Sequence, residues 1–452
     1  MEVKKLVTIK SSTMVRPTDE TPKGCLWLSR LDMMALQPYS HSLALYVYEP
    51  NKTQNTEPPF FDTDLLKKSL GKALVPFYTM AGRLHVNETN GRYEIDCNAE
   101  GVLFTEAKTL CSLTDLGGRV DPNSQLIKEL FCKCDYSKGW SSIPLVMVQL
   151  TRFKCGGVCL GVSEHHHVAD GQSYFLFINS WARLTKGLDI DHVRPVHDRF
   201  KYLAPRDPPL FDDSPHSSYI EPSLPPLELY GTEASITNAN FVLSESQINV
   251  LKQEAMSSPS SYKITTYSVL AGHVWRSVCK ARNLSDDQEV KLYIPVDGRP
   301  ILKNPTLPPG YVGNVIVYTA CKAKVRDIIN QPLWYAANKI SEAITKLKDP
   351  EYYRSAIDYI ETRPSVEPLV RGEKNFTCPN LRINAWTRLP MNESDFGWGA
   401  SILTGPGRVR SDGQAGFQPG KNHGDTVLII TLFSVHMTSF EKYFYDFKRG
   451  RL

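Results

Sequence analysis

The sequence predicts a mixed α/β protein built from two halves. At 452 residues the chain is too long for one ordinary core, and usual domain sizes favour two domains. Strand-like alternation and helical apolar stripes occur in both halves. Between Pro205 and Pro226, seven prolines occur in 22 residues, which excludes a helix or a central strand. We therefore expect a first domain over 1–204, an extended crossover over 205–234 and a second domain over 235–452.

The first half has strand-like segments before and after a predicted helix. That helix is expected to begin after Asp62 or Thr63, which suit an N-cap, and to end at Pro76. Gly156-Gly157 separates two apolar, β-branched segments and so predicts a buried hairpin. A second helix is expected just past Gly171, where apolar residues recur at helical spacing. The predicted strands cover 6–15, 41–48, 143–154 and 158–162.

The second half begins with a capping-box pattern, Ser244-x-x-Gln247, that predicts the start of a helix. A long helix is expected over 265–282, because its basic C-terminal end suits the helix dipole. An alternating strand over 290–296 leads into Asp297-Gly-Arg299. Pro332 is expected to open a further helix. Later strands are expected at 384–389 and 427–433.

Composition limits the classes of partner. The net charge of +4 is too small for a nucleic-acid-binding surface, and 41% hydrophobic with 22% charged residues is typical of a soluble globular protein. The N-terminus lacks the apolar core of a signal peptide, and no run reaches the roughly 20 apolar residues of a membrane span. We expect a cytoplasmic protein with no nucleic-acid partner. Ten cysteines without paired CxxC spacing predict free thiols rather than metal or disulfide use.

The stretch His165–Gly171 (HHHVADG) is the strongest candidate for chemistry. His166 stands four residues before Asp170, and histidine is the usual general base at neutral pH. Two other interpretations remain open: a metal site, which would need further ligands, and a structural histidine cluster at a helix start. A covalent nucleophile and a phosphate-binding loop are disfavoured, because neither G-x-S-x-G nor a glycine-rich phosphate motif occurs.

Two further sites have structural or surface interpretations when their residues are considered by themselves. Asp395-Phe-Gly-Trp-Gly399 predicts a rigid turn whose aspartate pairs with an arginine. Arg371, in Leu-Val-Arg-Gly, is by itself most simply a solvated arginine rather than a carboxylate clamp.

Taken together, HHHVADG and DFGWG resemble the paired motifs of the plant BAHD acyl-CoA-dependent acyltransferases, and the likeness extends over essentially the whole chain. Other segments, among them LVPFYTMAGRL, RFKCGGV and LPPGYVGN, are similar to the hydroxycinnamoyl-CoA branch. The resemblance implies two similar chloramphenicol-acetyltransferase-like domains joined by a long crossover, with the active site in a channel between them. It also implies a monomer with no metal and no cofactor, the CoA thioester being a co-substrate.

The resemblance assigns roles to particular residues. His166 would be the base that takes the acceptor proton, with no covalent acyl-enzyme. Asp170 would turn away from the substrate and hold the loop by pairing with an arginine. Asp395 would brace the second domain, with Arg299 as its suggested partner, although it is sometimes given a catalytic role. The segments that match the acyl-CoA site contain Thr265, Thr266, Tyr267, Arg282, Asp297 and Arg299.

The resemblance does not fix the acceptor. The matching acceptor-site residues are Tyr46, Arg371, Asn384 and Trp386, and Arg371 corresponds to a carboxylate clamp of the shikimate enzymes. Asn384 and Ala44 depart from the shikimate pattern. The first expectation is transfer of a hydroxycinnamoyl group to the hydroxyl of shikimate or quinate. Alternatives are N-acylation of anthranilate, a hydroxyphenyllactate ester, and a non-catalytic acyl-CoA-binding protein.

Overall fold

The chain forms two compact units in this computed structural model. Unit 1 comprises 1–204, 305–315 and 389–408, and unit 2 comprises 205–304, 316–388 and 409–452. The structure describes residues 5–34, 41–50, 58–117, 120–121, 123–191, 193–211, 235–256, 262–363, 376–407 and 411–446. Most of the proline-rich crossover expected at 205–234, and Arg371, lie outside these residues.

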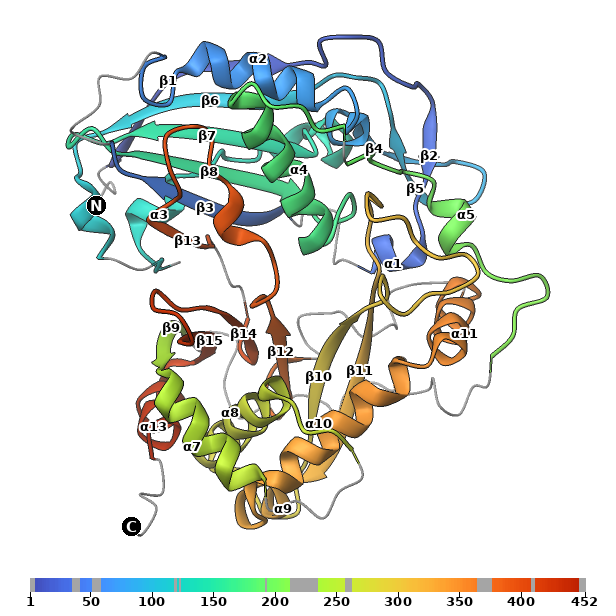
Figure 1. Cartoon of the computed structure of the whole chain (residues 1–452), viewed down its shortest axis with the longest axis vertical. Helices are drawn as coiled ribbons and strands as arrows, with labels where there is room; N and C mark the ends of the chain where they lie inside the picture. Colours follow the sequence, from blue (N-terminus) through green and yellow to red (C-terminus); the bar gives the residue numbers. More distant parts are fainter. Residues whose placement is uncertain are drawn as a thin grey trace. The chain divides into compact units, whose positions relative to one another are not determined.

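Unit 1 is organised around a mixed sheet. Within its described residues six strands pair in the order β1-β6-β7-β8-β3-β13, where only β6 and β7 run parallel, and β2, β5 and β4 form a small second sheet (Figure 1). The strands are β1 (Val7–Val15), β2 (Cys25–Trp27), β3 (His41–Tyr48), β4 (Arg83–Val86), β5 (Tyr93–Asp96), β6 (Val102–Thr109), β7 (Val146–Arg152), β8 (Val158–His165) and β13 (Leu403–Pro406). The helices are α1 (Arg30–Met33), α2 (Thr63–Ala73), α3 (Gln125–Glu129), α4 (Gly171–Thr185) and α5 (Arg199–Leu203).

The central strands of unit 1 are buried along their length, which explains their apolar sequences. All eight residues of β8 are buried, and only Arg152 at the end of β7 is exposed. Gly161 of β8 is required by close packing, because a Cβ there would lie 2.1 Å from the Leu130 carbonyl oxygen. The hairpin predicted from Gly156-Gly157 is confirmed, with β7 and β8 paired antiparallel.

Unit 2 contains a second mixed sheet. Its described strands pair in the order β11-β10-β12-β14-β15-β9, and β12 runs parallel to both of its neighbours. The strands are β9 (Ile236–Leu243), β10 (Glu289–Asp297), β11 (Ile316–Lys324), β12 (Leu381–Ala385), β14 (Gln414–Pro419) and β15 (Thr426–Phe433). The helices are α7 (Glu245–Ala255), α8 (Thr266–Arg282), α9 (Val325–Asn330), α10 (Leu333–Leu347), α11 (Pro350–Glu361) and α13 (Ser434–Phe444).

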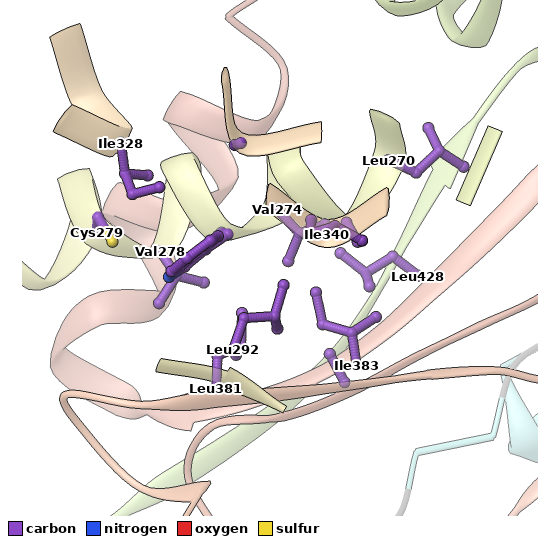
Figure 2. Packing of buried hydrophobic residues seen from close by; sticks show 14 of the residues in the cluster. Leu270, Val274, Val278, Cys279, Leu292, Ile328, Ile340, Leu381, Ile383 and Leu428 are labelled. Atoms are coloured by element: carbon purple, nitrogen blue, oxygen red, sulfur yellow. The ribbon is translucent and has the colours of Figure 1, made fainter. Parts of the chain in front are cut away.

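The core of unit 2 lies between its helices and this sheet. Figure 2 shows Val274 and Val278 of α8 above Leu292 and Ile383 of the strands, all of them fully or almost fully buried. Burying a side chain of this size stabilises the fold by about 1.5–3 kcal/mol. The capping box predicted at the start of α7 is present, with the Ser244 hydroxyl accepting from the Gln247 amide.

The mixed α/β class predicted from the sequence is confirmed, but the two units are not continuous in the sequence. The segments 305–315 and 389–408, which fall within the expected second domain 235–452, cluster with unit 1. The second of these contributes β13, which pairs antiparallel with β3 at the edge of the unit 1 sheet. In the described part of the chain, no helix combines the length and apolarity needed to cross a membrane.

Candidate active site

His166 lies in a turn between a buried strand and a long helix. We call residues His166–Asp170, which join β8 to α4, the histidine loop. The turn is closed by a hydrogen bond of 2.9 Å from the Val168 amide to the His165 carbonyl. His165 and His167 are each only 2% exposed, whereas His166 is partly exposed. The three consecutive histidines therefore differ in environment, and His166 is the one that keeps accessible surface.

The two buried histidines belong to an aromatic cluster. The ring of His165 lies 4.7 Å from that of His167 and 5.1 Å from that of His41, measured between centroids. Tyr93 packs edge-on against His167 at 5.7 Å. These contacts account for a structural role of His165 and His167, so the structural interpretation of the motif applies to them. A group of three or more metal-ligating side chains is not found among the described residues.

Asp170 begins helix α4 and fixes the end of the histidine loop. It is 2% exposed, and its carboxylate accepts hydrogen bonds from the backbone amides of Ser173 at 3.1 Å and Val315 at 3.0 Å. The first bond is an N-cap interaction, and the negative charge at a helix N-terminus also suits the helix dipole. These two contacts hold the end of the histidine loop, and the pairing of Asp170 with an arginine stays a prediction.

The 305–315 segment packs directly against this helix start. The Ser173 hydroxyl donates to the Gly313 carbonyl at 3.0 Å and accepts from the Gly313 amide at 3.1 Å. The side chain of Asn314 donates to the His166 carbonyl at 2.9 Å. The sequence did not single out Asn314, because the spacing of residues does not reveal which remote segment a loop contacts. Only the family-like segment LPPGYVGN, which ends at Asn314, pointed to this region.

The DFGWG turn is also part of unit 1. The Asp395 carboxylate accepts from the Gly397 and Gly399 amides at 2.8 and 2.9 Å, and both glycines have positive φ. Burial alone would raise the pKa of Asp395, but these amides and the ion pair with Lys186 at 3.4 Å outweigh it and lower the pKa. The rigid turn is thus confirmed, and Lys186 takes the place that the resemblance assigned to Arg299.

Helix α4 connects the DFGWG turn to the histidine loop. The buried Phe396 ring packs edge-on against Trp181 of α4, with centroids 4.8 Å apart. The Tyr48 hydroxyl of β3 donates to the Ser394 carbonyl at 2.7 Å. A Cβ at Gly171 would come within 3.1 Å of the Leu389 side chain. The two sequence motifs therefore brace the same helix, although they fall in different domains of the division expected from the sequence.

Tyr46 is fully buried inside unit 1. Its hydroxyl donates to the Tyr174 hydroxyl at 3.1 Å, and burial raises its pKa above the usual value. Close by, burial and then the charge of Asp170 raise the pKa of Glu164 well above the usual carboxyl value. Tyr46 thus belongs to a buried polar cluster, and its contact with the acceptor stays a prediction.

In unit 2, the predicted residues at the start of α8 and the end of β12 lie together. Thr265 is the N-cap of α8 and accepts from the Ser268 amide, and Thr266 is exposed. The Tyr267 hydroxyl donates to the Ile383 carbonyl at 2.8 Å, next to Asn384. Asn384 and Trp386 are partly buried. The strand expected at 384–389 is shifted, because β12 ends at Ala385 and Trp386 follows it.

The remaining acyl-CoA predictions divide into two cases. Arg299 donates to the Asp297 carboxylate through its backbone amide and its guanidinium, at 3.0 and 3.1 Å, and both residues are partly exposed. Arg282 is 3% exposed, and its guanidinium donates to Asp412 and to the Asn380 carbonyl, both at 2.7 Å. Arg282 is therefore paired inside the core of unit 2, and its contact with acyl-CoA stays a prediction.

Comparison with known proteins gives consistent matches over the whole chain. The model of the Transferase family matches residues 5–447. Anthranilate N-benzoyltransferase protein 1 of Dianthus caryophyllus is 48% identical over 98% of this chain and 100% of its own length. Shikimate O-hydroxycinnamoyltransferase of Nicotiana tabacum is 44% identical over the same shares. The crystal structure of vinorine synthase has a similar fold, with a TM-score of 0.71, 21% identity and 96% of each chain covered.

Proposed function

The chain belongs to the Transferase family of BAHD-type acyl-CoA acyltransferases, and we propose that it transfers an aromatic acyl group from CoA to the amino group of anthranilate or a related aminobenzoate. Membership of this family makes it an acyl-transferring enzyme, so the non-catalytic acyl-CoA-binding role is not retained. The proposed chemistry needs only the CoA thioester as co-substrate and neither a metal nor another cofactor.

The observation that carries the mechanism is the partial exposure of His166 between two buried histidines. In the proposed reaction the acceptor nitrogen attacks the thioester carbonyl and forms a tetrahedral intermediate. The imidazole of His166 accepts the proton that the nitrogen releases. When the carbon–sulfur bond breaks, the imidazolium returns that proton to the CoA thiolate. Such general acid–base catalysis contributes about 10²- to 10⁴-fold in rate.

The preference for a nitrogen acceptor rests on the relatives and on Asn384. The relatives named anthranilate N-benzoyltransferases are 47–48% identical to this chain, compared with 44% for the shikimate relative. This order favours N-acylation over the shikimate or quinate ester first expected from the sequence. Asn384 also departs from the shikimate pattern, and this departure likewise favours N-acylation. Anthranilate carries a carboxylate as shikimate does, so a clamp by Arg371, which lies outside the described residues, is compatible with either acceptor.

Acceptor competition tests this proposal. Purified protein would be supplied with benzoyl-CoA or p-coumaroyl-CoA and, in separate reactions, with anthranilate, shikimate, quinate or 4-hydroxyphenyllactate. Released CoA and product mass would be recorded, with His166→Ala as the control for turnover. We expect an amide with anthranilate at the highest kcat/KM, unchanged after treatment with EDTA. An ester with shikimate or quinate as the preferred product would reverse the assignment in favour of the second candidate.

The cytoplasmic location and monomeric state expected from the sequence are part of this proposal. Fluorescence microscopy of a tagged chain and size-exclusion chromatography with light scattering test them. A membrane-enclosed signal would contradict the first expectation, and a mass of about twice the chain's 50.9 kDa would contradict the second.

A further inference from the structure

Two backbone carbonyls of the histidine loop accept hydrogen bonds from side chains that are remote in the sequence. The Asn314 side-chain amide donates to the His166 carbonyl at 2.9 Å. The Arg199 guanidinium donates to the Val168 carbonyl at 2.7 Å. The two carbonyls belong to residues that stand two positions apart in one turn. The loop backbone is therefore held at two points by side chains rather than by a strand or helix ladder.

Both donors are anchored on one carboxylate, that of Asp32. Arg199 forms an ion pair with Asp32 at 3.2 Å. The backbone and side-chain amides of Asn314 donate to the other Asp32 oxygen at 2.8 and 3.0 Å. Asp32 is itself fixed by the capping box of α1, where it accepts from the Ser29 amide and hydroxyl. All three residues of this Asp32–Arg199–Asn314 network are 0% exposed.

The geometry selects these residue types. The Nδ2 atom of Asn314 lies between two acceptors, the His166 carbonyl and the Asp32 carboxylate, so it uses both of its hydrogens. An aspartate at 314 would place an oxygen against two acceptors. Arg199 reaches the carboxylate through Nε and the carbonyl through Nη2. A lysine carries one compact ammonium group and cannot reproduce that fork.

Stability alone is a weak explanation for such a network. Moving an aspartate and an arginine out of water is costly, and well-packed apolar residues in place of a buried ion pair are often neutral or stabilising. The network instead supplies orientation, because each donor fixes a carbonyl that flanks the His166 side chain. Proton transfer requires the base within hydrogen-bond reach of its proton, and a displacement of about 1 Å can cost on the order of 10²-fold in rate.

We propose that Asp32, Arg199 and Asn314 are positioning residues for the transfer reaction, which hold the backbone of the histidine loop so that the His166 imidazole keeps its catalytic orientation. The inference rests on the proposed role of His166 as the base. It concerns only contacts inside unit 1.

Asn314→Ala is the sharpest variant, because it removes the two side-chain hydrogen bonds and leaves the Asp32–Arg199 ion pair in place. We expect kcat to fall about 10- to 100-fold while KM for both substrates stays within about 2-fold, since the substrate contacts are unchanged. Arg199→Lys, which retains a positive charge opposite Asp32, is expected to lower kcat in the same way. If Asn314→Ala is insoluble, Arg199→Lys serves as the test by itself.

The matched control is a buried aspartate of unit 2. Asp358 is 0% exposed, pairs with Arg206 at 2.6 Å and accepts from the Arg206 and Leu210 amides. Asp358→Asn and Asp32→Asn therefore make the same substitution at a fully buried aspartate that pairs with an arginine, although Arg206 is partly exposed and Arg199 is not. We expect Asp358→Asn to lower the thermal midpoint but to leave kcat unchanged below it, whereas Asp32→Asn lowers both. Assays would run at a temperature where circular dichroism shows every variant folded.

The outcomes separate the two proposals. If His166→Ala keeps full turnover, the base assignment fails and the positioning role fails with it. If His166→Ala is inactive but the folded Asn314→Ala or Arg199→Lys variant keeps kcat within about 2-fold, only the positioning role is overturned. An equal loss of kcat in Asp358→Asn and Asp32→Asn would also overturn it. A loss of kcat confined to the network variants, at constant KM, supports it.

Discussion

Replacing Asp170 by alanine tests whether this aspartate stabilises the fold by joining two remote segments or only by capping a helix. Its carboxylate accepts from the Ser173 amide within α4 and from the Val315 amide at the end of the 305–315 segment. Asp62 provides a control, because it is the N-cap of α2 in the same unit, is partly exposed and accepts from the Leu65 amide. The two substitutions to alanine therefore share the loss of an N-cap.

The structure gives a difference in magnitude between the two variants. Loss of an N-cap costs about 1 kcal/mol, and this applies to both Asp62→Ala and Asp170→Ala. Asp170→Ala also leaves the Val315 amide without its carboxylate, which costs a further 1–3 kcal/mol or so for a buried group. We expect Asp170→Ala to lower the free energy of unfolding by about 2–4 kcal/mol, and Asp62→Ala by about 1 kcal/mol.

Urea titration followed by near-ultraviolet circular dichroism measures both values on purified protein, with the slope of each transition compared with that of the wild type. The slopes should agree, so that a shift in midpoint reports stability. The reasoning would be refuted if Asp170→Ala destabilised the protein no more than Asp62→Ala, because the contact with Val315 would then contribute nothing.

Three further predictions use the same purified protein. Gly161→Ala should lower the free energy of unfolding by about 3 kcal/mol or more, because the new Cβ would meet a backbone carbonyl. Gly171→Ala should be tolerated, because its Cβ would meet only the end of a leucine side chain. Soluble yield and thermal midpoint distinguish the two variants. Burial lowers the pKa of His197 to about 4, so this residue contributes stability that is present above about pH 6.5 and lost as the pH falls toward 4. The free energy of unfolding should then change by at most about 1.4 kcal/mol per pH unit over that window. His197→Gln should flatten this pH dependence when it is measured by urea titration, and an unchanged slope would contradict the assignment. Lys186→Met should change the free energy of unfolding by less than about 1 kcal/mol, since its ion pair with Asp395 is partly exposed. Asp395→Ala should lower it by about 1–2 kcal/mol, since this variant removes the acceptor of the Gly397 and Gly399 amides. Equal effects would mean that the hydrogen bonds from these two amides do not contribute to stability.

The location of the DFGWG turn in unit 1 changes how its aspartate is understood. Asp395 closes the turn through two glycine amides, and the adjacent Phe396 packs on Trp181 of α4. Because α4 starts at the histidine loop, the turn supports the helix that carries Asp170 at its N-cap. A structural role through α4 follows from these contacts, and none of them requires the turn to touch a substrate.

The sequence by itself determined the features that depend on neighbouring residues. The Gly156-Gly157 hairpin, the capping box of α7 and the long helix α8 all follow from spacing and turn chemistry within about 20 residues. The prediction that His166 is the base also came from a seven-residue motif and its pairing with DFGWG, and it stays a prediction. Local energetics favoured one structure at each of these places, so the pattern and the fold agreed.

Only the tertiary structure decided the contacts that join remote segments. Asn314 meets Asp32 across 282 positions of the chain, and Arg199 meets Asp32 across 167. A hydrogen bond at such separation leaves no periodicity in the sequence, because either partner alone is an ordinary polar residue. For the same reason the sequence did not reveal that Arg282 pairs with Asp412. Burial and partner, rather than residue type, determine what each of these charged side chains does.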